Sequence, residues 1–147
     1  MKSRRFKKYI FESVRGNRVI IIRFIVGLIF LSEGIQKFLF PETLGVGRFE
    51  KIGFSNPEFW AAFTGVFEIV CGLFVLSGFM VRMAAVPLLI VMITAFITTK
   101  VPILTGRGFW AFAHEYRTDF AMTFLLIYLL LYNVRRRPFG NNLKRVR

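Results

Sequence analysis

WAAFTGVFEIVCGLFVLSG, residues 60–78, is an apolar stretch with one charged side chain, Glu68. About 20 apolar residues in a helix span the ~30 Å hydrocarbon core of a bilayer, so the stretch predicts a transmembrane helix. A charged acid at that depth costs about 2.5–3.5 kcal/mol on insertion scales and is usually paired, protonated or turned toward a polar interior. Ala61, Gly65, Glu68 and Gly72 share one helix face, and small residues there allow another helix to approach closely. We therefore expect Gly65 and Gly72 at a helix contact and a partner for Glu68 on the facing helix.

The composition places the chain among membrane proteins. It has 147 residues, of which 55% are hydrophobic, and its charges are segregated from its apolar runs. The mean hydropathy is +0.56. The single cysteine, Cys71, excludes an intrachain disulfide, a C-x-x-C thiol-exchange centre and a cysteine-ligated cluster.

Three further apolar runs complete the predicted architecture, an all-α integral membrane four-helix bundle. The first covers residues 19–39 and the third residues 81–99, with loops at 41–57 and 101–108. The fourth begins at Phe109 or as late as Thr118 and ends near Val134. The predicted organisation is a basic arm (1–18), a four-span membrane domain (19–134) and a basic tail (135–147).

The basic residues predict the topology. The net charge is +13, but the cations flank the apolar runs, which favours lipid headgroups over nucleic acid as partners. The arm, the tail and Arg82 hold fourteen basic residues, against five in or beside the two long loops, namely Arg48, Lys51, Lys100, Arg107 and Arg117. Because the basic side of a membrane protein faces the cytoplasm, we expect both termini there, in a multi-pass membrane protein.

The first span offers cations to Glu68. Arg23, Gly27, Gly34 and Lys37 lie on one face, and we expect Arg23 to pair with Glu68, directly or through a water. In the alternative, Arg23 extends to the inner interface and Glu68 stays protonated.

Polar groups gather near the predicted outer end of the bundle. A polar rim above an apolar bundle suits a ligand with a polar head and a lipid tail, such as a quinone or a phospholipid. His114 and its neighbouring carboxylates are candidates for proton relay. The alternative is a solvated helix end held by ion pairs. The predicted ligand-binding residues are Arg23, Glu33, Gln36, Lys37, Glu68, Lys100, His114, Glu115 and Asp119.

No metal or covalent cofactor is predicted. One histidine cannot supply paired axial ligands to a haem, and zinc or copper would lack nitrogen and sulfur ligands. A weak metal site at His114, Glu115 and Asp119 is the lesser alternative. Electron transfer would then need an organic cofactor or a partner protein, and no catalytic residue is assigned.

The chain resembles the DoxX family of small four-helix membrane proteins. The resemblance rests on RFIVGLIFLSEGIQKFLFP (residues 23–41), FTGVFEIVCGLFVLSGFMVRMAA (63–85) and FWAFAHEYRTDFAM (109–122). It implies a bacterial cytoplasmic-membrane protein associated with redox systems, since a DoxD-type relative is a subunit of a thiosulfate:quinone oxidoreductase. The tail RRRPFGNNLKRVR departs from the Gly-rich tail of many members.

Two functions follow from these observations. The first is a quinone- or lipid-binding subunit of a membrane redox or oxidative-stress system, working with a peripheral redox protein. The second is a non-enzymatic anchor or assembly factor, or a small lipid-binding or transport module. Whether the chain is an enzyme, and whether it forms homo-oligomers, stay open at this stage.

Overall fold

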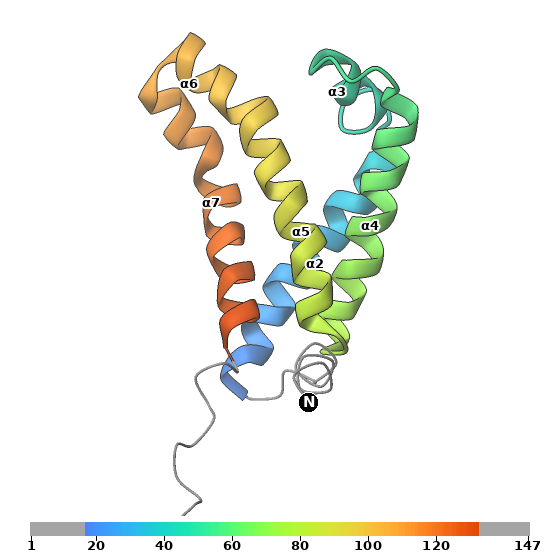
Figure 1. Ribbon diagram of the computed structural model, residues 1–147, viewed down its shortest axis with the longest axis vertical. Coiled ribbons are helices and arrows are strands. Elements are labelled where there is room, and N and C mark those ends of the chain that lie inside the picture. Colours follow the sequence, from blue (N-terminus) through green and yellow to red (C-terminus); the bar gives the residue numbers. More distant parts are fainter. Residues whose placement is uncertain (1–16, 133–147) are drawn as a thin grey trace, which may run out of the picture.

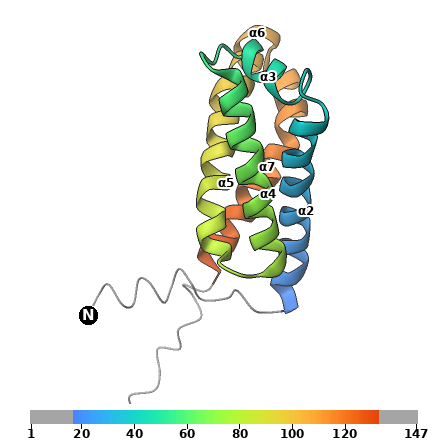
Figure 2. The ribbon, with the colours of Figure 1, turned by 90° about the vertical axis from the view of Figure 1, so that its right-hand side faces the viewer.

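The computed structural model describes residues 17–132, and this part of the chain is helical, without strands (Figures 1 and 2). The predicted all-α class is therefore confirmed. The predicted basic arm, apart from residues 17 and 18, and the predicted basic tail lie outside the described residues. The elements are α2 (Asn17–Leu39), α3 (Val46–Lys51), α4 (Pro57–Ser77), α5 (Val81–Ala95), the π-helix η1 (Phe96–Lys100), α6 (Val101–Arg107) and α7 (Phe109–Leu131).

Three helical segments are long and apolar enough to cross a membrane: Val19–Leu39, Pro57–Ser77 and Val81–Arg107. The fourth long helix, α7, has 23 residues but carries Glu115, Arg117 and Asp119 in its first half. In Figure 1, α2 begins and α7 ends at the same end of the bundle. The structure thus supports a multi-pass membrane protein, whereas the fourth crossing and the cytoplasmic termini stay predictions.

Two predicted loops are partly helical. Residues 101–108 were expected to form a loop, but the third helix continues through η1 and α6 to Arg107, so this expectation was wrong. Pro102 lies in the first turn of α6, where its missing N–H does least harm. The loop at 41–57 contains the short helix α3. Of the two predicted starts of the last helix the earlier is observed, at Phe109, directly after Gly108 with φ 85°.

Helices α2 and α4 pack through glycines, as the small-residue faces predict. A Cβ atom added at Gly34 would lie 2.7 Å from the carbonyl oxygen of Gly65. One added at Gly72 would lie 3.1 Å from the carbonyl oxygen of Gly27. Such distances leave no room for larger side chains, so the expected close contact at Gly65 and Gly72 is confirmed. The facing pairs also fix the antiparallel register of the two helices.

The buried core lies toward the end of the bundle where α2 begins. It is built from the beginnings of α2 and α5 and the ends of α4 and α7, with Val26, Val75, Leu88, Leu126 and Leu129 fully buried. Toward the other end the helices separate into two arms (Figure 1). We call α2, α3 and α4 the first arm, and α5, η1, α6 and α7 the second arm.

Candidate functional site

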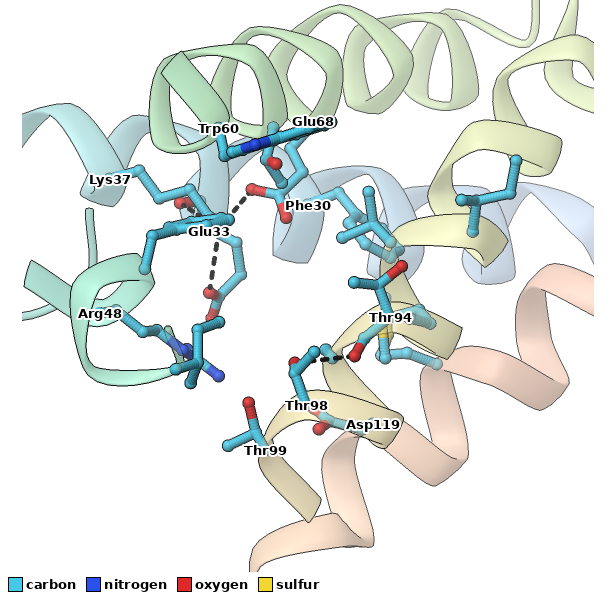
Figure 3. Close-up of a pocket in the computed structure, with 18 of the residues that line it drawn as sticks. Phe30, Glu33, Lys37, Arg48, Trp60, Glu68, Thr94, Thr98, Thr99 and Asp119 are labelled. Atoms are coloured by element: carbon cyan, nitrogen blue, oxygen red, sulfur yellow. Dashed lines mark hydrogen bonds and ion pairs between the residues drawn. The ribbon is translucent and has the colours of Figure 1, made fainter. Parts of the chain in front are cut away.

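A cavity of about 300 Å³ lies between the two arms, beside α3 (Figure 3). Ligand pockets in proteins commonly hold about 300–1,000 Å³, so this cavity has room for a head group rather than a whole lipid. Much of its wall is apolar or aromatic, including Phe30, Trp60 and Phe63. The polar side chains that line it are Glu33, Lys37, Arg48, Thr64, Glu68, Thr94, Thr98, Thr99, Lys100, Thr118 and Asp119.

A buried ion pair forms the wall of the first arm. Lys37 Nζ on α2 lies 2.5 Å from Glu68 Oε2 on α4, and only 8% and 4% of the two side chains are exposed. Lys37 Nζ also lies 4.0 Å from Glu33 Oε2, one turn earlier on α2. Because 48% of the Glu33 side chain is exposed, the three groups lead from the accessible surface to a buried acid. Glu68 thus has the charged partner that its depth requires, but the partner is Lys37.

The predicted pairing of Arg23 with Glu68 was wrong. Arg23 Nε donates to the carbonyl oxygen of Val75 at 3.0 Å, and its Nη2 donates to that of Leu76 at 2.7 Å. Helical side chains lean toward the N-terminus of their own helix. In two antiparallel helices, Arg23 and Glu68 therefore lean apart, whereas Lys37 leans toward Glu68.

A second ion pair lies on the wall of the second arm. Lys100 Nζ lies 3.2 Å from Asp119 Oδ2 and donates to the carbonyl oxygen of Glu115 at 2.8 Å. Lys100 is 7% exposed and ends η1, a π-helical turn that changes the register of the residues after it. Such turns often occur at functional sites. Here the last residue of the turn is Lys100, which joins the third helix to α7 beside the cavity.

Arg48 enters the cavity from α3. Its guanidinium extends from the first arm toward Thr98 and Thr99 on the second (Figure 3). The other cavity-lining charges form the two ion-paired groups, whereas within residues 17–132 the guanidinium of Arg48 takes part in no ion pair or hydrogen bond. Phe54, which follows α3, contacts Trp60 edge to face at 5.8 Å between ring centroids. The short helix thus contributes a cation and part of an aromatic wall.

Five of the nine predicted site residues line this cavity: Glu33, Lys37, Glu68, Lys100 and Asp119. The other four do not. Arg23 on α2 contacts the last turn of α4, far from the cavity. Gln36 donates to Ser32 on its own helix at 2.7 Å. His114 and Glu115 are exposed on α7, and only the Glu115 carbonyl contacts the lysine of the site. Ligand binding by any of these residues stays a prediction.

The sequence reading missed Arg48 as a cavity residue. It lies in a segment that was read as a loop, and its apolar neighbours Phe49 and Phe54 were the available signal. Of the threonines that line the cavity, Thr98 donates to the carbonyl oxygen of Thr94 one turn earlier on the same helix, at 2.8 Å.

The cavity is balanced in charge and suited to hydrogen bonding. Three acidic and three basic side chains line it, together with five threonine hydroxyls. Within the described residues, no three His, Cys, Asp or Glu side chains are grouped so as to hold a metal ion. The arrangement can therefore bind and orient a small polar head between aromatic walls, and its carboxylates can exchange protons.

Comparison with known proteins identifies the family of the chain and agrees with its membrane character. The DoxX family model matches residues 19–101. A protein of Mycobacterium tuberculosis named "uncharacterized membrane protein Rv3486" is 53% identical over 118 residues, covering 76% of this chain and 72% of the relative. No solved structure matches the chain. The family match covers the ion pair of the first arm, Arg48 and the π-helical turn, and the chain belongs to the DoxX family.

Proposed function

We propose that this protein binds the head group of a membrane quinone in the cavity between its arms. In this proposal it is a subunit that works with a peripheral redox protein in the bacterial cytoplasmic membrane. The observation that carries the proposal is a head-group-sized cavity with aromatic walls and two buried lysine–carboxylate pairs.

The charge balance favours a quinone over a phospholipid. With three acids and three bases around it, the cavity has no net charge to attract a phosphate. A quinone head is flat, uncharged and rich in carbonyl oxygens, so it fits between Phe30, Trp60 and Phe63 without a counter-ion. Its isoprenoid tail would leave the cavity between the arms and extend into the bilayer.

The two tryptophans of the chain allow a direct test. Trp60 lines the cavity, whereas Trp110 is 83% exposed and does not. In the Trp110→Phe variant, titration with 2-methyl-1,4-naphthoquinone should quench Trp60 fluorescence in a saturable way. In the matched Trp60→Phe variant, Trp110 should show only the weak linear quenching that quinone dissolved in the detergent causes. Equal, non-saturable quenching in both variants would contradict the proposal. Displacement of the quinone by a short-chain phospholipid would instead favour a lipid site.

We further propose four spans with both termini in the cytoplasm. The support is the distribution of basic residues, fourteen against five, together with the shared end at which α2 begins and α7 ends. In a Cys71→Ala background, single cysteines at Ser55 and Asn142 should react with an impermeant maleimide from opposite sides of the membrane. Labelling of both positions from outside would contradict this topology.

A further inference from the structure

Polar donors face the cavity from both arms. Arg48 presents a guanidinium from α3 on the first arm, half-buried and without an ion pair inside the described range. On the second arm, the half-buried Thr99 has a hydroxyl that makes no hydrogen bond among residues 17–132. Lys100 has three N–H donors, of which one donates to the carbonyl oxygen of Glu115, and its ammonium group forms an ion pair with Asp119. Unused donors therefore lie on both sides of the same small space.

Beside the cavity, no hydrogen bond or ion pair between described residues joins the first arm to the second arm. The ion pair of the first arm joins α2 to α4, and that of the second joins η1 to α7. In the described structure, no hydrogen bond or ion pair joins Arg48 to the threonines that it faces in Figure 3. A ligand with one acceptor can satisfy one arm, whereas a ligand with acceptors at two opposite ends can satisfy both.

From this arrangement we infer that the ligand head is a 1,4-dione that bridges the two arms. Arg48 donates to one carbonyl oxygen and Thr99 to the other. The inference rests on the proposed quinone site and narrows it, because it assigns the two residues that recognise the head. It distinguishes a dione from lipids with a single polar group, such as a fatty acid.

The inference is tested in the Trp110→Phe background with Trp60 fluorescence as the readout. Loss of one hydrogen bond to the ligand corresponds to about a tenfold loss of affinity, so Arg48→Met, which has no N–H donor on its side chain, and Thr99→Val should each weaken binding of 2-methyl-1,4-naphthoquinone by about tenfold. Lys51→Gln, on the same short helix but exposed and outside the cavity lining, should bind with the parent affinity. Circular dichroism and size-exclusion chromatography verify that each variant is folded.

Competition experiments separate ligand classes. 1-Tetralone, with a fused ring system but one carbonyl, should displace the dione from the parent only at about tenfold higher concentration or more. Undiminished binding by Arg48→Met, or equal affinity of the parent for 1-tetralone and the dione, would overturn the bridging arrangement while leaving a quinone site in place. Tighter binding of a long-chain carboxylate than of the dione would identify a fatty-acid site and overturn the inference. Absence of any saturable Trp60 quenching in the parent would overturn the proposed function itself.

Discussion

The two ends of the α2–α4 interface use a cation from α2 in different ways. At the end of the bundle where α2 begins and the arms meet, Arg23 donates to the carbonyl oxygens of Val75 and Leu76 in the last turn of α4. Carbonyls in the last turn lack the regular N–H donors of a continuing helix; Val75 also accepts from the N–H of Gly78 at 3.2 Å, and Arg23 supplies further donors that cap α4. At the cavity end, Lys37 meets the Glu68 carboxylate instead. One face of α2 thus carries two cations with different partners. Arg23 bonds to backbone carbonyl oxygens at the end of α4, whereas Lys37 forms an ion pair with the Glu68 carboxylate beside the cavity.

This difference predicts that the buried Lys37–Glu68 pair contributes more to the free energy of unfolding than the bonds of Arg23. The Lys37–Glu68 pair is almost inaccessible, and removing the Glu68 charge leaves the buried Lys37 with only the exposed Glu33 carboxylate, 4.0 Å away. We expect Glu68→Gln to lower the free energy of unfolding by about 3–5 kcal/mol, measured by reversible denaturation in detergent micelles.

The double variant Lys37→Gln/Glu68→Gln is the matched control. Since neither charge then remains buried alone, it should recover part of the loss, with a coupling energy of about 1–3 kcal/mol. Strictly additive effects of the two single changes would contradict the pairing.

The second prediction concerns the glycine contact that holds both cations in place. Gly34→Leu would drive a side chain into the backbone of α4 and should cost about 1–3 kcal/mol of unfolding free energy. Gly106→Leu is the control, because a Cβ atom at Gly106 meets no neighbour within 4 Å. A Gly34→Leu variant as stable as the Gly106→Leu variant would show that the helices are not in close contact.

Sequence reasoning predicted the interface better than the pairing within it. Glycines at spacings of seven residues on both helices mark the facing sides, since close packing demands small residues. They do not by themselves decide which cation meets Glu68, because Arg23 and Lys37 share that side. The decision depends on side-chain direction along antiparallel helices.

The cavity itself was only partly predictable. Lys37, Glu68 and Lys100 were found because charged residues within apolar runs are conspicuous. Arg48 was missed because its place depends on how a short helix folds over the bundle, and its apolar neighbours Phe49 and Phe54 show that the segment packs without showing where. His114 and Glu115 are near Asp119 in sequence, but the rotation of α7 exposes them.

The third prediction distinguishes the capping cation from the paired one. Arg23→Gln removes two hydrogen bonds to the end of α4 and should cost about 1–2 kcal/mol of unfolding free energy. Arg23 and Lys37 lie about 20 Å apart along α2 at 1.5 Å per residue. The double variant Arg23→Gln/Glu68→Gln should therefore be additive within about 0.5 kcal/mol. A coupling as large as that between Lys37 and Glu68 would restore the rejected pairing.

The smallest effect is expected at the ion pair of the second arm. The Asp119 side chain is 28% exposed, and Lys100 keeps its bond to the Glu115 carbonyl when the carboxylate is removed. Asp119→Asn should therefore cost only about 1 kcal/mol of unfolding free energy. Since water and salt reach a partly exposed pair, this cost should fall further in 0.5 M sodium chloride, whereas the cost of Glu68→Gln should hardly change. Denaturation of both variants at low and high salt measures the contrast. Equal, salt-independent losses would mean that the Asp119 carboxylate is as inaccessible to water and salt as that of Glu68, and that charge pairing holds the second arm together as firmly as the first.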